Sequence, residues 1–294
     1  MRSAWGVFAL FIATGAAFLI WMFMPIQASQ PAITLTGDPA RGAYLARMSG
    51  CIACHTNEEK ASGILAGGAA LESPFGVFAA PNITLSPEHG LGRWSIDDFA
   101  TAVRQGISPQ GRPYYPAFPY QFYSGFSDQD IADLWSVLPR VPVVDAPDPA
   151  TDIRFPFSIR AGLKPWQRLF GAPVAASPVS GQSADYNRGR FIVEGPAHCA
   201  ACHTPRNMAG ALKTQSWFAG TTLLPGGENA PAIDARSLSA NGWTVADLAY
   251  ALQTGITPQG DVLGGSMAEV ILGGTQFLTE EDRRAMAIYL LAEP

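Results

Sequence analysis

The four cysteines of the chain are divided between two short segments of one pattern, C-x-x-C-H. The first is GCIACHT, residues 50–56, and the second is HCAACHT, residues 198–204. Paired thiols at this spacing, followed directly by a histidine, are the pattern in which haem is attached covalently and the histidine binds the iron. We therefore expect two covalently bound haem c groups. The expected residues are Cys51, Cys54 and His55 for haem 1, and Cys199, Cys202 and His203 for haem 2.

Two other chemistries use paired cysteines, and the sequence disfavours both. A redox-active disulfide needs only C-x-x-C, and a four-cysteine zinc site would leave the histidines unexplained. Neither accounts for a histidine at the same offset, with threonine after it, in both segments. The remaining histidine of the second segment, His198, is expected to stay at the surface.

The two segments belong to a repeat that covers most of the chain. RGAYLARMSGCIACHT from Arg41 matches RGRFIVEGPAHCAACHT from Arg188. Further on, WSIDDFATAVRQGISPQG matches WTVADLAYALQTGITPQG, and FSDQDIADLWSVL matches LTEEDRRAMAIYLL. Because the order is kept, the repeat predicts two copies of one domain, at 34–141 and 184–294.

Short helices are expected in both copies. A hydroxyl residue three positions before an acid, ahead of an apolar-periodic run, marks a helix start. No segment alternates strongly enough to predict a strand. We therefore predict a mainly α protein, with a helix before each C-x-x-C-H segment and another at the end of each copy. The start signals are Ser95 with Asp98, Ser127 with Asp130, Thr244 with Asp247, and Thr279 with Asp282.

Residues 142–183, between the copies, are rich in proline. Proline disfavours helix interiors and central strands. The aromatic and aliphatic side chains of this segment argue against a flexible linker. We expect a connector that packs over both copies, with one short helix at Pro165–Phe170.

The first 28 residues predict a membrane anchor. The apolar run from Ala4 to Met24 is about long enough to span a bilayer as a helix. Trp5 and Trp21, near its two ends, suit the membrane interfaces. We therefore expect a transmembrane helix at 1–28, in contact with membrane lipid.

The same segment predicts export of the rest of the chain. The positive-inside rule keeps Arg2 in the cytoplasm, so the body would lie in the periplasm of a bacterial inner membrane. The alternative is a cleaved secretory signal, for which IQA before Ser29 is a weak cleavage site. The length of the apolar run favours the uncleaved anchor. A net charge of −5 and a pI of about 5.4 argue against nucleic acid as a partner.

Tandem C-x-x-C-H domains, the anchor and the connector FPFSIRAGLKPWQRLF resemble the membrane-anchored multihaem cytochrome c subunits of periplasmic dehydrogenases of the alcohol and gluconate type. The resemblance implies tandem class I-like cytochrome c domains. It also implies an electron-donor dehydrogenase or quinol-oxidising complex, and a cytochrome, copper protein or terminal oxidase as acceptor. Members of that family usually carry three haems, whereas this chain has two attachment segments.

Haems that transfer electrons usually have a second protein ligand, and methionine raises their potential. In copy two we expect Met267, because such domains take the ligand from a loop before the last helix; its alternative role is core packing. Met208 lies too near the attachment segment, and Met286 falls inside the final helix. We also expect the carbonyl of Pro205 to hold the N–H of His203, with no equivalent proline in copy one.

Copy one has no methionine at the matching position. When the copies are aligned without gaps from their shared tryptophans, Phe118 falls opposite Met267, and no methionine lies between 49 and 207. The position above the iron held by His55 is then open, blocked by Phe118, or filled by another ligand. Tyrosine and histidine both bind haem iron, although packing and a surface loop are their ordinary roles. The candidates are Tyr120, Tyr115 and His89.

The leading functional hypothesis is a membrane-anchored dihaem cytochrome c that carries electrons and has no catalytic residue. The alternative is a dihaem peroxidase-like or oxidase-like enzyme, with its chemistry at an open or unusually ligated haem 1. Cleavage of an oxygen–oxygen bond needs placed polar groups, whereas the loop around Phe118 offers mainly Phe, Tyr and Pro. We therefore favour the carrier.

Overall fold

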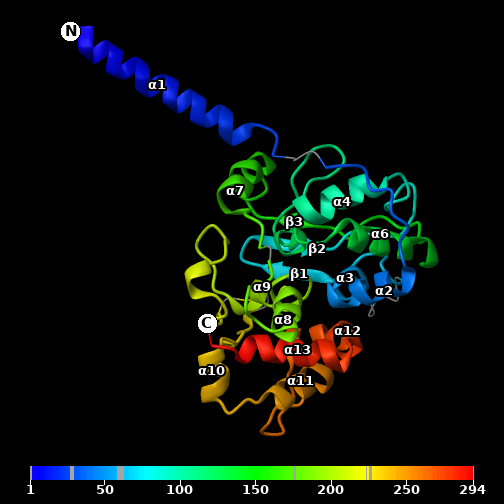
Figure 1. The fold of residues 1–294 in the computed structure, drawn as a ribbon. Helices are drawn as coiled ribbons and strands as arrows, with labels where there is room; N and C mark the ends of the chain where they lie inside the picture. The colour runs from blue at the N-terminus through cyan, green and yellow to red at the C-terminus, as the bar shows by residue number, and fades with distance from the viewer. Residues whose placement is uncertain are drawn as a thin grey trace.

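The computed structural model describes residues 2–26, 30–57, 63–174, 177–222, 224 and 227–293, and the backbone alone for 2–6 and 9–11. A long helix, α1 (Arg2–Phe23), precedes a body in which similar elements recur (Figure 1). The first elements of the body are α2 (Pro39–Met48), α3 (Cys51–His55), β1 (Ala70–Ser73), β2 (Gly76–Ala79), α4 (Ile96–Gln105), α5 (Tyr120–Tyr123) and α6 (Asp128–Val137). They are followed by β3 (Asp152–Ile153), α7 (Leu163–Phe170), α8 (Ala184–Glu194), α9 (Ala200–His203), α10 (Ala235–Ala240), α11 (Val245–Thr254), α12 (Gly265–Gly273) and α13 (Glu280–Leu291).

Hydrogen bonds at the helix starts confirm the predicted capping signals. Ser95, Ser127 and Thr244 each accept a bond from the backbone N–H three residues on, and the acid at that position bonds back. Thr279 accepts from the N–H of Asp282 in the same way, but the carboxylate of Asp282 bonds to α8 instead. These caps satisfy otherwise unpaired donors and fix where α4, α6, α11 and α13 begin.

In each half of the body, the first and last helices cross at a glycine. A Cβ on Gly42 of α2 would lie 2.0 Å from the carbonyl oxygen of Asp133 in α6. A Cβ on Gly189 of α8 would lie 1.9 Å from the carbonyl oxygen of Ala285 in α13. The crossings therefore leave no room for a side chain. The arginine before each glycine forms ion pairs across the same crossing, Arg41 with Asp130 and Asp133, and Arg188 with Asp282.

A small antiparallel sheet lies near the middle of the body, where the sequence predicted no strand (Figure 1). Strand β2 pairs with β1, Ala70 opposite Ala79, and with β3, Val77 opposite Asp152. Gly76 (φ 124°) admits the backbone of β3, because a Cβ there would lie 2.3 Å from the carbonyl oxygen of Asp152. Strands of four and two residues are too short to show a periodic pattern in the sequence.

The proline-rich connector packs over both halves, as expected. Its helix α7 contains the predicted Pro165–Phe170 and begins slightly earlier. Nε2 of Gln167 donates to the carbonyl oxygen of Gln105 at the end of α4 (2.6 Å). Nε1 of Trp166 donates to the carbonyl oxygen of Ala209 in the second half (2.7 Å). The connector is therefore part of the body.

One hydrophobic core runs through both halves. Ile131 of α6 and Ile192 of α8 are fully buried in the same cluster. The hydroxyl of Tyr44 in α2 donates to the carboxylate of Asp282 in α13 (2.6 Å). Because apolar packing and polar bonds both cross the boundary, the halves form one body.

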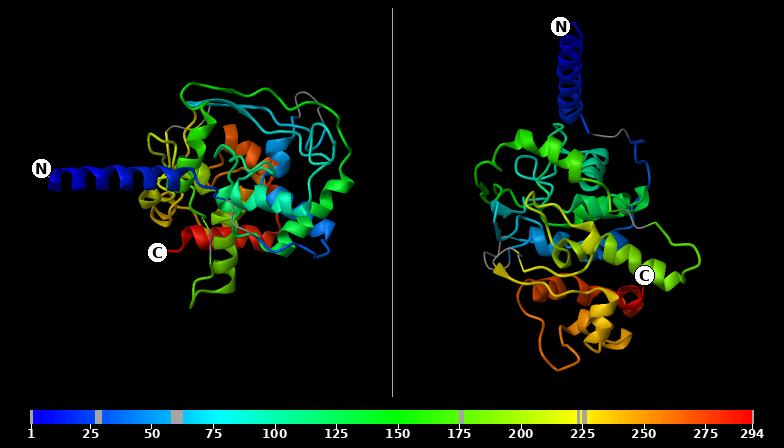
Figure 2. Two further views of the ribbon diagram at one scale, coloured as in Figure 1. Left: turned by 90° about the horizontal axis from the view of Figure 1, so that it is seen from above. Right: turned by 90° about the vertical axis from the view of Figure 1, so that its left-hand side faces the viewer.

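Helix α1 projects away from the body in every view (Figures 1 and 2). Near its end, the guanidinium of Arg168 in α7 stacks on the ring of Trp21, 4.8 Å from the centroid. Arg168 also donates to the carbonyl oxygen of Met24 (3.2 Å). No helix in the described part of the chain combines the length and the hydropathy that a bilayer crossing requires.

We predict that Gly42→Ala lowers the free energy of unfolding, although alanine is the better helix former. The added methyl group would overlap the backbone of α6, and separating the helices costs roughly 2 kcal/mol. Chemical denaturation of the purified protein measures the change. Gly125→Ala is the matched control, because a Cβ there meets nothing within 4 Å. Equal stability of the two variants would contradict the close crossing.

Candidate haem-attachment sites

The two attachment segments form one-turn helices, α3 and α9, that begin after a sharp turn. Gly50, directly before Cys51, is left-handed (φ 68°), a conformation that glycine adopts without strain. His198, directly before Cys199, is also left-handed (φ 39°) although it carries a side chain. A strained backbone at a non-glycine residue needs support from its surroundings, which His198 finds in the neighbouring segment.

No disulfide joins the four cysteines, of which Cys54 is exposed and the other three are half-buried. Burial, followed by the charge of the neighbouring thiol, raises the pKa of Cys51 and Cys199 to about 12. Burial also raises the pKa of Cys54 and Cys202. Cysteines that exchange disulfides have lowered pKa values, so that the thiolate forms. The paired thiols here therefore differ from that class.

One hydrogen bond to a proline carbonyl fixes each histidine ring. Nδ1 of His55 lies 2.7 Å from the carbonyl oxygen of Pro81, and Nδ1 of His203 lies 2.7 Å from that of Pro231. A carbonyl only accepts, so Nδ1 carries the hydrogen and Nε2 keeps its lone pair for a metal. Burial lowers the pKa of both histidines, which keeps the rings neutral at pH 7.

The expectation that Pro205 holds His203, with no such proline in copy one, is wrong. The proline partners come 26 and 28 residues after the histidines, because the intervening loops fold back onto the rings. A repeated signal marks them, since Ala-Pro-x-Ile occurs at 80–83 and again at 230–233. This hydrogen bond is the same at both sites, so it gives no reason for unequal potentials.

The loop after each histidine is held by equivalent bonds. Oγ1 of Thr56 accepts from the backbone N–H of Leu65 (3.2 Å), and Oγ1 of Thr204 accepts from that of Phe218 (3.1 Å). The carbonyl oxygen of each histidine accepts from a glycine N–H, at 2.9 Å in the first half and 2.8 Å in the second. The two sites therefore share one backbone frame.

The two attachment segments also touch each other. A Cβ on Gly50 would lie 3.5 Å from Cε1 of His198. The ring of Tyr123 packs edge-on against His198, with centroids 5.8 Å apart, and its hydroxyl donates to the carbonyl oxygen of Ser49 (2.7 Å). His198 is therefore half-buried between the two sites, and the expectation of a surface position is wrong.

The turn before the expected sixth ligand is the same in both halves. Gly111 and Gly260 are both left-handed (φ 71° and 85°), and each is spanned by one antiparallel bridge. This agreement supports the gap-free matching of Phe118 with Met267. Met267 lies in α12, not in a loop as expected, and packs half-buried against the core. The residues around it contain no proline, so the chain continues as a helix.

Phe118 lies within a cluster of tyrosine rings just before α5. Its ring centroid is 5.9 Å from those of Tyr114 and Tyr123, and 6.3 Å from that of Tyr120. Gly106 makes room for this cluster, because a Cβ there would lie 2.3 Å from the ring of Tyr120. At the residue that the sequence matches with Met267, copy one therefore has a cluster of aromatic rings.

The other candidate ligands of haem 1 differ in what they contact. The hydroxyl of Tyr115 donates to the carbonyl oxygen of Phe157 in the connector (2.9 Å). His89 lies in a turn of the segment that follows Pro81, which is the segment that holds His55. The hydroxyl of Tyr120 is buried, and no described group bonds to it. Among the three, Tyr120 alone has a buried donor in need of a partner.

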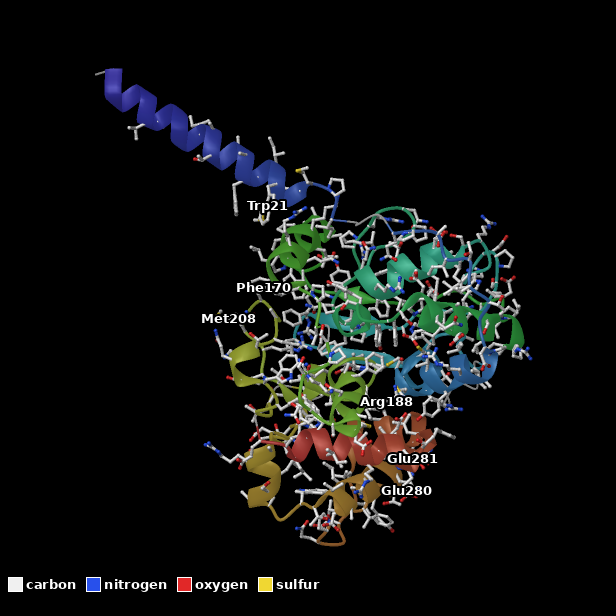
Figure 3. All side chains as sticks on the ribbon, viewed as in Figure 1. Trp21, Phe170, Arg188, Met208, Glu280 and Glu281 are labelled. Atoms are coloured by element: carbon white, nitrogen blue, oxygen red, sulfur yellow. The ribbon has the colours of Figure 1, made fainter. Side chains whose placement is uncertain are left out.

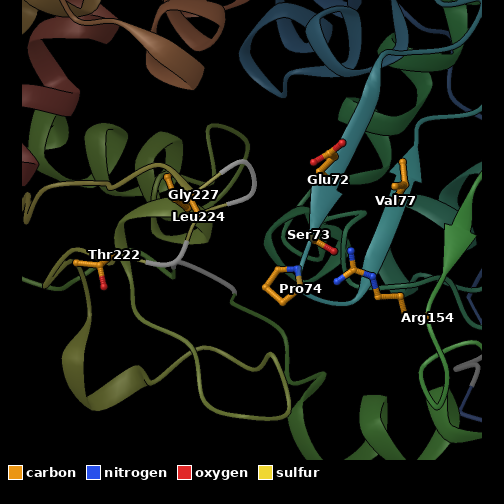
Figure 4. A pocket seen from close by; sticks show the side chains of 8 residues that line it. All are labelled: Glu72, Ser73, Pro74, Val77, Arg154, Thr222, Leu224 and Gly227. Carbon is orange, nitrogen blue, oxygen red and sulfur yellow. The ribbon is translucent and has the colours of Figure 1, made fainter.

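An open cleft of about 390 Å³ lies between the β1–β2 hairpin and the second half (Figure 4). Glu72 and Arg154 line one side of it, and Thr222 and Leu224 the other. No cysteine or histidine is among the described residues that line it. The cleft is therefore separate from the attachment segments.

Comparison with known proteins places this frame in a family. No protein-family model matches the chain. A diheme cytochrome c-type protein of Cereibacter sphaeroides is 40% identical over an alignment of 299 positions, which covers 100% of this chain and 98% of that one. The fructose dehydrogenase cytochrome subunit of Gluconobacter japonicus is 39% identical over 92% of this chain and 54% of its own length. The cytochrome c subunit of an alcohol dehydrogenase (quinone) of Gluconobacter oxydans is 37% identical over 86% and 54%.

Two thiol pairs, each with a histidine whose Nε2 is left for a metal, fit covalent haem. The indole N–H of Trp217 is buried and lacks an acceptor among the described residues. A bound haem, which carries propionate oxygens, could supply that acceptor. The chain belongs to the family of dihaem c-type cytochromes. Its cofactors are two covalently bound haem c groups, and electron transfer is the role that follows. The resemblance to dehydrogenase cytochrome subunits is confirmed, although the chain spans about half their length.

We predict that Tyr123→Phe lowers the free energy of unfolding by about 1–3 kcal/mol, because the carbonyl of Ser49 loses its donor in a buried place. Tyr120→Phe is the matched control. It should not lower stability and should leave the absorption spectrum unchanged, since its hydroxyl has no partner among the described residues. Denaturation of the holoprotein measures the first effect. A changed haem spectrum in Tyr120→Phe would instead make Tyr120 a ligand of haem 1.

Proposed function

We propose that the chain carries electrons between two haems held at α3 and α9. The support is the repeated frame, in which a pair of thiols and a neutral, oriented histidine share one helical turn. We further propose the domain division 34–141 and 184–294, joined by the connector 142–183. Haem 1 is assigned to Cys51, Cys54 and His55, and haem 2 to Cys199, Cys202, His203 and Met267.

The observation that carries this proposal is the contact between the two attachment segments. His198 lies against Gly50 on one side. On the other, a Cβ on Gly273 of α12, the helix that bears Met267, would lie 2.7 Å from the Cβ of Ala53 in α3. Cofactors attached at touching segments exchange electrons inside one protein, and such exchange needs no substrate cavity.

For haem 1 we assign His55 as the protein ligand and Phe118 as the neighbour on the opposite face. A phenyl ring has no lone pair for iron. Methionine ligation raises the reduction potential of a haem, so haem 2 with Met267 is the better electron acceptor. Electrons therefore pass from haem 1 to haem 2.

The names of the relatives support a dehydrogenase as the donor, and a quinol-oxidising complex is the alternative donor. A cytochrome, a copper protein or a terminal oxidase is the acceptor that this direction requires. We assign residues 1–28 to a membrane anchor and the body to the periplasm. The support is that the chain from Ser3 to Gly37 contains no Asp, Glu, Lys, Arg or His.

Peroxidase-like or oxidase-like chemistry at haem 1 is the second candidate function, and the absence of methionine at Phe118 favours it. The ring cluster around Phe118 opposes it, because it crowds the face on which peroxide would bind. Steady-state consumption of hydrogen peroxide by the reduced protein decides between the two. Sustained turnover of peroxide would show that the protein is an enzyme and not only an electron carrier.

We predict that Phe118→Met converts haem 1 to a six-coordinate, low-spin haem. Its potential should rise by on the order of 100 mV, within the ~0.8 V range that axial ligands set. Electron paramagnetic resonance and redox titration measure both changes. Phe118→Leu, which removes the ring without adding sulfur, should keep the original spin state. Two low-spin signals in the unaltered protein would show that another residue already binds haem 1.

We predict that Met267→Ala lowers the potential of haem 2 by on the order of 100 mV and abolishes the sulfur-to-iron charge-transfer band. Met208→Ala is the control, because Met208 is fully exposed and should leave both haems unchanged. After photoreduction, the electron should settle on haem 2 at a rate independent of protein concentration, and less completely in Met267→Ala. A rate proportional to concentration would contradict transfer within one chain.

A further inference from the structure

Two stretches of the chain carry cations without any acid. Residues 153–184 contain four Lys or Arg and no Asp or Glu, and residues 195–227 contain two more, again without an acid. The whole chain, in contrast, has a net charge of −5. Positive charge is therefore concentrated in these stretches. Its carriers are Arg154, Arg160, Lys164, Arg168, Arg206 and Lys213.

These stretches meet beside the end of α1. Arg168 of α7 stacks on Trp21 of α1, and Trp166 of α7 bonds to the carbonyl of Ala209 in the second stretch. Figure 3 shows Trp21, Phe170 and Met208 following one side of the molecule. The end of α1, helix α7 and the turn around Met208 therefore form one continuous surface.

Apolar side chains on this surface face solvent. Leu169 is 53% exposed, Phe170 37% and Met208 100%. Leu163, on the inner side of α7, is buried, so the helix has one face on the body and another without a partner among the described residues. We name the outer set the α7 surface. Its members are Trp21, Lys164, Arg168, Leu169, Phe170, Met208 and Lys213.

We propose that the α7 surface rests on the headgroups of a bilayer that contains anionic lipid. This inference rests on the membrane anchor proposed above. Cations next to exposed apolar side chains are the combination by which interfacial segments bind membranes. Anionic headgroups attract Lys and Arg within about one Debye length, and tryptophan prefers the interface.

The position of the surface favours lipid over a protein partner. The surface begins at Trp21, near the end of the proposed anchor, and Arg168 ties α7 to that end. An anchored chain therefore holds the α7 surface at headgroup depth, where a bulky partner would have to displace the membrane. Contact at both α1 and α7 also fixes the orientation of the body, and with it the distance of each haem from the bilayer.

The test uses the full-length holoprotein in nanodiscs of phosphatidylcholine alone or with one quarter phosphatidylglycerol. A water-soluble acetylating reagent labels lysines, and mass spectrometry follows Lys164 and Lys213. We expect labelling in the anionic discs to be roughly threefold slower than in neutral discs or in detergent. Because salt screens the attraction, 0.5 M salt should remove most of the difference between the discs.

A triple variant tests the apolar contribution. Leu169→Gln combined with Phe170→Gln and Met208→Gln should abolish the protection of both lysines. Val262→Gln is the matched control, because Val262 is 74% exposed but lies between α11 and α12, at the far end of the body (Figure 1). The haem absorption spectrum confirms that each variant is folded. Equal protection in the triple variant and the control would overturn the proposal.

Flotation with lipid vesicles separates the two proposals. A holoprotein that does not float overturns the anchor, and with it this inference. A holoprotein that floats while both lysines react equally in detergent and in either disc overturns the α7 surface alone. Protection that appears only after a soluble dehydrogenase is added would assign the surface to a protein partner, and would also overturn the proposal.

Discussion

Both haem sites depend on the hydrogen bond from a histidine Nδ1 to a proline carbonyl. The bond fixes the tautomer and turns Nε2 away from the backbone, while the one-turn helix holds the paired thiols on the same turn. Each proline lies more than twenty residues after its histidine, and in the first half β1 and β2 lie between the two. Thr56 and Thr204 accept hydrogen bonds from backbone N–H groups of these intervening segments. Much of each half therefore serves to orient one imidazole ring.

The repeat could predict α4, α6, α11 and α13, because their starting signals are local, but it did not predict α12, where a loop was expected. Ser95 and Thr244 begin helices through bonds to residues three positions on, and the crossing glycines follow arginines that the repeat already aligns. What could not be predicted depends on contacts distant in sequence. The strands are too short to show a period, and the packing of His198 against Gly50 joins segments that only the fold brings together. The proline partners were predictable in part. The repeated Ala-Pro-x-Ile marks both prolines in the sequence, but only the fold shows that their carbonyls accept from the histidine rings.

The two halves share the frame around each histidine, although among the described residues β1 and β2 belong to the first half and α10 to the second. The turns at Gly111 and Gly260 match, and the bonds to the histidine rings have equal lengths. The contrast between the sites therefore falls on Phe118 and Met267, where one half brings a ring and the other a sulfur. If Phe118 and Met267 face the irons as proposed, this difference gives electron flow a direction, because axial ligation acts directly on the potential of the iron.

The connector links the two haem-bearing halves to the N-terminal helix. The shared core already joins the two halves, and α7 adds bonds to α4 and to the second half at once. The same helix contacts Trp21 through Arg168, so the segment that bonds to both halves also holds α1 against the body. Packing of the connector therefore helps to fix two relative positions. One is the position of the two haems relative to each other, and the other is their position relative to the N-terminal helix. A change that loosens α7 should therefore disturb both relative positions.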